Sequence, residues 1–305
     1  MKITNNFDLP EAFSRALEKK TAAYDSGNVN RSATQLINAP RIDILRKEYY
    51  SELEKDLSEE MMALLGNGVH HILEEGAEEH VLCEERLYGA LAGWTFSGAI
   101  DAQHFNADDT ISIDDYKVTT SFSLTKDQGE PKPDWVKQLN IYGWLIRHNK
   151  GKDIKNLRII AVIRDWSRSK AQRDELYPQA PVVTVNLPVW SQAEAEQYII
   201  DRIHEHQKAE LLFESGYELP FCSPQDQWEN GAKWAVQKKN AKRAKSIHPT
   251  KEEAEEILST HDDPSLEIIY RPGTKSRCAG DWCQVSRWCT QWQTEQALKE
   301  LKNEE

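Results

Sequence analysis

Apolar residues recur at helical spacing in several stretches of the chain. In PDWVKQLNIYGWLIRH, Trp135, Leu139 and Tyr142 stand three or four positions apart, which predicts a helix. Further helices are predicted over residues 64–75 and 191–214, and the second of these opens with a Ser-x-x-Glu capping pattern.

Other stretches are rich in β-branched and aromatic residues, which favour strands. The segment CEERLYGALAGWTFSGAIDAQHF predicts two strands that turn at Ala92 and Gly93, and ISIDDYKVTT and NLRIIAVIRDW each predict one more. Helices and strands then follow one another as helix, hairpin, strand, helix, strand, helix. This order predicts an α/β fold with a mixed central sheet flanked by helices.

The C-terminal third has a different organisation. KWAVQKK and KRAKSI predict a small hairpin, TKEEAEEIL a capped helix, and LEIIYRPG a third strand. We therefore expect a main domain over residues 1–215 and a small α/β unit over residues 216–305.

Composition indicates a globular protein, since 39% of the 305 residues are hydrophobic and 29% are charged. No run of 18 apolar residues occurs, and MKITNNFDLPEAFSRALEKK lacks the apolar core of a signal peptide. We expect a cytoplasmic protein that does not contact membranes. The net charge of −12 argues against broad non-specific binding to nucleic acid. A basic segment is still present, because the stretch from Gly231 through Lys251 contains seven Lys or Arg and no acid.

The strand ISIDDYKVTT carries charges at positions where a buried strand would be apolar. Side chains alternate along a strand, so Asp115 and Lys117 share one face. Such charges are costly to bury unless they are paired or hold a metal ion. The preceding strand carries Asp101, which the hairpin can place beside Asp115. These residues suit a divalent cation and a phosphate, although a simple ion pair between Asp115 and Lys117 would also explain them.

The order of GAID, IDDYK and QLNIY resembles the PD-(D/E)XK nuclease superfamily. The likeness is to its RecB-like branch, which includes the CRISPR-associated iron–sulfur exonucleases, and to phage-type members of it. The resemblance implies a restriction-endonuclease-like core in which Asp101 is the first metal-binding acid. It makes Asp115 and Lys117 the (D/E)xK pair, and Gln138 and Tyr142 the QxxxY signature that lies along the DNA.

A histidine upstream extends the resemblance. Gly66-x-x-x-His70 matches the helix that precedes the site, where the histidine is a further metal ligand. One or two Mg²⁺ or Mn²⁺ ions are then expected on His70, Asp101 and Asp115, with Lys117 orienting or activating the attacking water.

The function implied is that of a metal-dependent deoxyribonuclease, most simply an exonuclease on single-stranded DNA ends. It would act in phage or bacterial recombination, repair or DNA processing, inside a bacterial or phage-infected cell and with protein partners from those processes. Two alternatives remain open. One is a catalytically inactive nucleic-acid-binding protein, and the other is an interaction module stabilised by zinc.

Three cysteines, Cys278, Cys283 and Cys289, have the spacing C-x4-C-x5-C, and Cys222 is the best fourth ligand. A four-thiolate site suits zinc or an iron–sulfur cluster. The resemblance implies a structural [4Fe-4S] cluster, with Zn²⁺ as the alternative. This chain departs from the family in two ways: the first gap is four residues rather than two, and the distant cysteine follows the nuclease core.

The basic segment KKNAKRAK lies on the predicted hairpin. Its side chains would neutralise DNA phosphates, which makes binding salt-dependent. The same charges could equally belong to a solvated hairpin. Besides Gln138 and Tyr142, the residues that we expect to contact nucleic acid are Lys238, Lys239, Lys242 and Arg243.

Overall fold

The computed structural model describes residues 1–23, 27–125, 129–241 and 243–304. The chain divides into two compact units. Unit 1 comprises residues 1–38 and 54–217, and unit 2 comprises residues 39–53 and 218–305. The segment 39–53 thus belongs with the C-terminal part of the chain. Among the described residues, no helix has both the length and the apolar character needed to span a bilayer.

Unit 1 is built on a mixed sheet with the strand order β2-β5-β6-β7-β8, and β4 pairs with β5 as well. The neighbours β6 and β7 are parallel, as are β2 and β5, while the remaining pairs are antiparallel. The sheet therefore has the mixed character that the sequence predicts. Its strands are β2 (Arg31–Ser32), β4 (Val81–Leu91), β5 (Trp94–Phe105), β6 (Ile111–Thr119), β7 (Ile154–Ile163) and β8 (Val182–Leu187).

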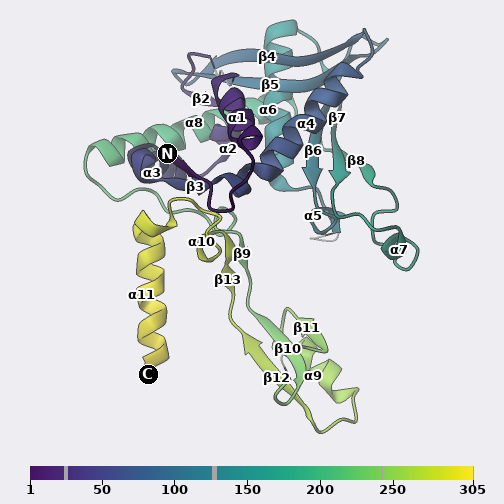
Figure 1. Ribbon diagram of the computed structural model, residues 1–305, viewed down its shortest axis with the longest axis vertical. Coiled ribbons are helices and arrows are strands. Elements are labelled where there is room, and N and C mark those ends of the chain that lie inside the picture. Colours follow the sequence, from purple (N-terminus) through teal and green to yellow (C-terminus); the bar gives the residue numbers. More distant parts are fainter. Residues whose placement is uncertain (24–26, 126–128, 242, 305) are drawn as a thin grey trace. The chain divides into compact units, whose positions relative to one another are not determined.

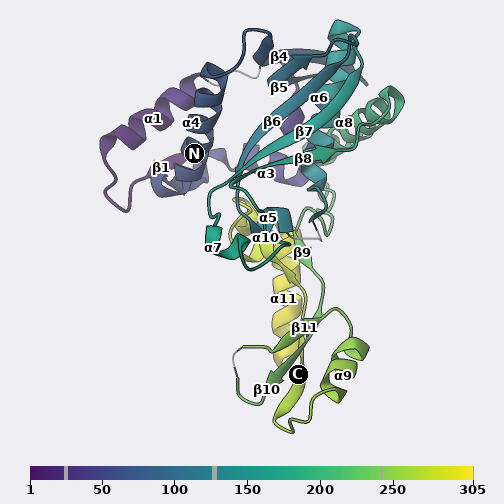
Figure 2. The ribbon, with the colours of Figure 1, turned by 90° about the vertical axis from the view of Figure 1, so that its right-hand side faces the viewer.

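Helices cover both faces of this sheet. The helix α4 (Met61–Glu75) lies on one face, and α6 (Pro133–Lys150) and α8 (Gln192–Glu214) lie on the other (Figures 1 and 2). Leu139 and Ile146 of α6 are completely buried, as the helical spacing predicts. Shorter elements complete unit 1: β1 (Lys2–Thr4), α1 (Glu11–Ala23), α2 (Ala33–Ile37), β3 (Glu54–Asp56), η2 (Leu57–Glu60), α5 (Phe122–Thr125) and α7 (Arg168–Ala171).

The β4–β5 hairpin turns where the sequence predicts. Ala92 and Gly93 both have left-handed backbone conformations, with φ of 47° and 78°. Two such residues in succession form a tight turn whose twist matches the flanking strands. The turn fixes the register of β5, and so fixes where Asp101 falls along the sheet.

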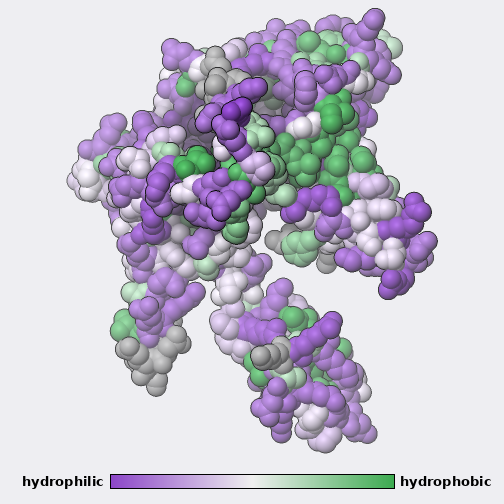
Figure 3. Space-filling model, viewed as in Figure 1, coloured by the Kyte–Doolittle hydropathy of each residue, from purple (hydrophilic) through white to green (hydrophobic). Residues whose placement is uncertain are grey.

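The edge strand β8 was not predicted from the sequence. It pairs with β7, and its Val182 remains 48% exposed. On the side seen in Figure 3, apolar side chains gather over β6, β7 and β8, beyond the region that α4 covers. By alternation and register, Val118, Ile160 and Val162 lie on that face.

Unit 2 contains a small three-stranded antiparallel sheet with the order β11-β10-β12. The helix α9 packs on it through Ala254 against Val236 and Leu266. The hairpin, the helix capped by Thr250 and the third strand are confirmed. The elements of unit 2 are α3 (Pro40–Glu48), η1 (Tyr50–Glu52), β9 (Glu229–Asn230), β10 (Lys233–Lys238), β11 (Ser246–His248), α9 (Lys251–Ser259), β12 (Leu266–Arg271), β13 (Thr274–Lys275), α10 (Ser276–Ala279), η4 (Ser286–Trp288) and α11 (Thr290–Glu304).

A buried histidine makes the stability of unit 1 dependent on pH. His206 of α8 lies 3.3 Å from the carbonyl oxygen of Leu36, and burial lowers its pKa to about 4 from the usual 6.5. The unfolded chain therefore binds a proton at a higher pH than the folded one does. The stabilisation is complete above pH 6.5 and is lost as the pH falls towards 4, by up to about 3 kcal/mol.

We predict that His206→Gln flattens this pH dependence, since glutamine can still donate to Leu36 without titrating. The measurement is urea unfolding between pH 7 and pH 4.5, followed by hydrogen exchange in α8 peptides. His204→Gln, at an exposed position of the same helix, is the matched control. Equal pH dependence in His206→Gln and wild type would contradict the prediction.

Candidate metal centres

Three side chains from separate elements of unit 1 converge on one point. His70 of α4, Glu84 of β4 and Asp101 of β5 each offer a ligand atom, and these atoms lie within 4.8 Å of one another. The Nδ1 atom of His70 is 3.5 Å from Asp101 Oδ2 and 3.8 Å from Glu84 Oε1. An imidazole and two carboxylates are a donor set that suits a divalent cation.

The backbone around Glu84 is irregular. The β4–β5 ladder pairs Cys83 with Ala102 and Glu85 with Ile100, and it skips Glu84. Glu84 has a φ of 52°, a left-handed conformation that is uncommon for a residue other than glycine. Strained conformations of this kind cluster at functional sites. Glu84 was not predicted from the sequence, where its only signal is an acidic pair within a predicted strand.

The second expected acid lies on the adjacent strand. β5 and β6 are antiparallel and pair Ala102 with Asp114. Asp101 and Asp115 therefore stand at the next position along these two neighbouring strands. Asp115 is only 1% exposed, and its Oδ2 atom lies 2.5 Å from Lys117 Nζ. Asp115 and its partner Lys117 thus lie on the strand next to Asp101, but among the described residues Asp115 is not one of the three whose ligand atoms lie within 4.8 Å of one another.

The main chain between Asp115 and Lys117 also faces this cluster. The carbonyl oxygen of Tyr116 lies 2.8 Å from His70 Nε2, and its N–H donates to Asp101 Oδ2 at 2.8 Å. Adjacent ligands of an octahedral cation with bonds near 2.1 Å stand about 3 Å apart. The Tyr116 oxygen is at that separation from His70 Nε2, while the other ring nitrogen, Nδ1, faces Asp101 and Glu84.

The pKa values of the ionisable groups in this site are shifted by burial and by neighbouring charges. Burial, together with the Asp115 carboxylate, raises the pKa of Asp101 to about 7. Burial alone would lower the pKa of Lys117, but the Asp115 and Asp101 carboxylates outweigh it and raise that pKa. Lys117 therefore stays protonated and acts as a fixed positive charge. The Glu84 carboxylate likewise raises the pKa of His70.

Gln138 and Tyr142 lie behind Asp115. Gln138 Nε2 is 2.8 Å from Tyr142 Oη and 3.5 Å from Asp115 Oδ1, and both side chains are buried. A β-carbon at Gly98 would come within 2.5 Å of the Tyr142 ring, so the ring needs glycine at that position. This arrangement orients Asp115 from the core side of the sheet.

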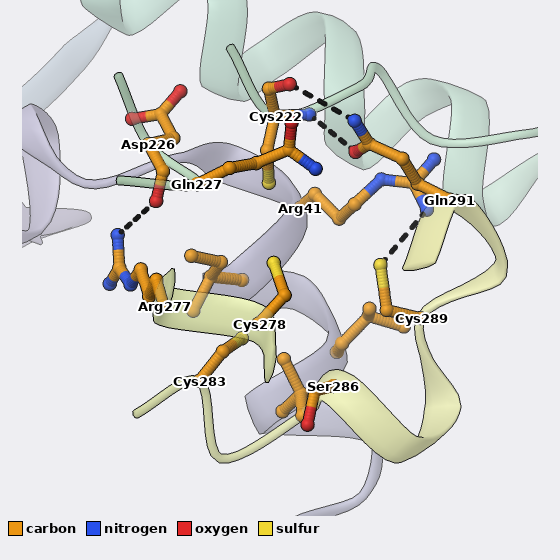
Figure 4. A pocket seen from close by; sticks show the side chains of 13 residues that line it. Arg41, Cys222, Asp226, Gln227, Arg277, Cys278, Cys283, Ser286, Cys289 and Gln291 are labelled. Atoms are coloured by element: carbon orange, nitrogen blue, oxygen red, sulfur yellow. Dashed lines mark hydrogen bonds between the residues drawn. The ribbon is translucent and has the colours of Figure 1, made fainter. Parts of the chain in front are cut away.

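The four expected cysteines of unit 2 line one pocket (Figure 4). The sulfur atoms of Cys222, Cys278 and Cys289 face its interior. Gln291 holds Cys222 by accepting from its N–H and donating to its carbonyl, at 2.8 and 3.1 Å. Burial raises the pKa of Cys222 to about 12 and that of Cys278 to about 11. A metal centre would hold these side chains as thiolates instead.

The spacing of the sulfurs bears on the kind of centre. Tetrahedral zinc, with Zn–S bonds near 2.3 Å, holds its sulfurs about 3.8 Å apart. Among the described residues, His70, Glu84 and Asp101 are the three whose ligand atoms all lie within 4.8 Å of one another. No three cysteine sulfurs are that close together. The thiols are therefore spread more widely than a single zinc ion requires.

The basic segment lies on the turn that joins β10 to β11. Lys238, Lys239 and Arg243 are exposed, and Lys238 Nζ lies 3.4 Å from Asp263. Lys242 lies outside the described residues. On the neighbouring sheet, Tyr270 is 52% exposed, and its ring centroid is 4.9 Å from that of Trp234.

Comparisons with known proteins give only distant likenesses. No protein-family profile and no curated protein matches the chain. A solved structure titled SSO0001 is 18% identical, over 63% of this chain and 83% of its own, with a TM-score of 0.44. A candidate exonuclease from Eubacterium rectale is 14% identical, over 68% and 76%, with a TM-score of 0.31. LHK-Exo in complex with dAMP is 12% identical, over 69% and 88%, with a TM-score of 0.26. Likenesses this distant carry no argument about what the chain does.

We predict that Glu84→Gln weakens Mn²⁺ binding by about tenfold or more, because it removes one negative donor from the His70 group. Titration calorimetry with Mn²⁺ measures the affinity. Glu75→Gln, at an exposed position of α4, is the control and should bind as wild type does. Unchanged affinity in Glu84→Gln would exclude this carboxylate as a ligand.

Proposed function

We propose that the protein is a metal-dependent nuclease of the PD-(D/E)XK type that hydrolyses phosphodiester bonds in DNA. The observation that carries this proposal is the convergence of His70, Glu84 and Asp101, with Asp115 and a protonated Lys117 on the adjacent strand. Two acids on adjacent strands, with a lysine two residues beyond the second, give both a cation site and a separate positive charge for the phosphate.

In this proposal each residue has a distinct task. His70, Asp101, Asp115 and the Tyr116 carbonyl hold one or two Mg²⁺ or Mn²⁺ ions, with Glu84 as an additional carboxylate. The cation lowers the pKa of a bound water and offsets charge on the phosphate. Lys117, with its positive charge fixed by Asp115, orients the water or stabilises the phosphate oxygens.

Gln138 and Tyr142 then act through Asp115. Their hydrogen bonds hold the carboxylate from behind, so its oxygens keep their direction when a cation binds. Their burial supports this positioning role.

The substrate proposed is DNA, with single-stranded ends attacked by an exonuclease in phage or bacterial recombination, repair or processing. This finer statement rests on the resemblance of the motifs. The exposed Lys238, Lys239 and Arg243 would bind the DNA backbone, as would Lys242. Protein partners would come from the same processes, inside a bacterial or phage-infected cell.

We propose a [4Fe-4S] cluster as the occupant of the four-cysteine pocket, in a structural role. Four thiols around one pocket fit either such a cluster or Zn²⁺. Among the described residues no three cysteine sulfurs lie within 4.8 Å of one another, which is compatible with the larger centre. The cluster would join α3, the segment around Cys222 and the C-terminal turns of unit 2.

The proposal predicts that Asp115→Asn and Lys117→Ala each lower Mn²⁺-dependent release of nucleotides from end-labelled single-stranded DNA by about a hundredfold or more. Asp108→Asn and Lys155→Ala are matched controls, because these residues form an exposed ion pair between the β5–β6 turn and β7. The controls should keep wild-type activity. Wild-type protein that leaves all DNA intact, but binds it, would favour the inactive binding protein instead.

A further inference from the structure

A buried guanidinium lines the four-cysteine pocket. Arg41 lies on α3, is 2% exposed, and is separated in sequence from the cysteines by more than a hundred residues. Its five N–H groups match five acceptors, and Figure 4 shows it reaching towards Cys289. The acceptors are the carbonyls of Pro220 (3.0 Å) and Leu219 (2.5 Å), the carboxylate of Glu218, the hydroxyl of Thr290 (2.9 Å) and the sulfur of Cys289 (3.7 Å).

This bonding pattern has a consequence for Cys289. A buried cation needs a nearby anion, and the carboxylate partner Glu218 is itself 55% exposed. A neutral thiol is a weak acceptor, whereas a thiolate is a charged one that strengthens the bond. Arg41 therefore fits the ligated, thiolate form of Cys289 better than the protonated form.

The charges of the pocket point the same way. Four thiolates around a centre with two positive charges carry a formal net charge of about −2. Two guanidinium groups line the pocket, those of Arg41 and Arg277, beside the carboxylate of Asp226, and they would offset part of this negative charge. Arg41 donates directly to one of the sulfurs, that of Cys289.

We propose that Arg41 is a positioning residue of the four-cysteine centre, and that its N–H···S bond makes a bound iron–sulfur cluster easier to reduce. The inference rests on the proposed occupant of the pocket. Hydrogen bonds to the sulfurs and nearby positive charge both stabilise the more negative, reduced state. Removing the bond then shifts the reduction potential to a more negative value.

The experiment uses the full chain purified without oxygen. Iron, sulfide and zinc are counted, and the cluster is titrated by spectroscopy against redox mediators. Arg41→Lys keeps the positive charge but loses the directed bond. At the wild-type midpoint we expect its reduced-to-oxidised ratio to fall at least about threefold, which is roughly 30 mV for one electron. Glu218→Gln removes a negative charge and keeps the N–H···S bond, so it should not move the potential in that direction.

Each outcome of this experiment supports or overturns the role proposed for Arg41. Wild-type protein without bound metal overturns both the proposed cofactor and the role of Arg41. A cluster with the same potential in Arg41→Lys and wild type overturns the role of Arg41 alone. If the metal is zinc, faster zinc release to a chelator from Arg41→Lys than from Glu218→Gln supports the positioning role, and equal release overturns it. If Arg41→Lys does not fold, Thr290→Val is measured in its place. This substitution removes the Thr290 acceptor and leaves Cys289 as the acceptor of Arg41 Nη1, so the reduction potential must not become more negative.

Discussion

Two carboxylates on adjacent strands are the constraint on which the account of unit 1 depends. Asp101 and Asp115 are both buried, and their mutual repulsion together with burial raises the pKa of Asp101 to about 7. Such a pair is unfavourable unless positive charge is close by. Lys117 provides part of it, and a divalent cation between the acids and His70 would provide the rest. The sheet, the hairpin turn and α4 all serve to hold these groups together.

Unit 2 presents a related problem with thiols in place of carboxylates. Four cysteines line one pocket, Gln291 holds the main chain of Cys222, and a buried arginine accompanies them. In both units, groups that are costly to bury in one protonation state become favourable once a metal shares the site. The two centres therefore follow the same physical logic, with hard oxygen ligands in one and soft sulfur ligands in the other.

Much of the fold could be predicted because its local signals agree with its packing. The helix through Trp135 and Leu139, the β4–β5 turn at Gly93, and the strand that carries Asp115 were all expected from periodicity and turn chemistry. The motif residues also lie where a common site requires. Strand β8 was missed because it is a short apolar run between Pro181 and Pro188.

The remaining residues depend on tertiary context. The residues next to Glu84 in the sequence do not specify a left-handed backbone. That conformation occurs where the β4–β5 ladder is interrupted opposite Asp101. Arg41 looks like an ordinary helical surface residue in sequence. Its role emerges only because the segment 39–53 packs with residues far along the chain, in unit 2.

The most direct test of the central claim is anomalous diffraction from crystals of the wild-type protein soaked in Mn²⁺. The account predicts a manganese peak about 2.3 Å from carboxylate oxygens of both Asp101 and Asp115, with the His70 imidazole and the Tyr116 carbonyl around the same ion. A crystal that binds manganese elsewhere, with no peak between these residues at millimolar Mn²⁺, would contradict it.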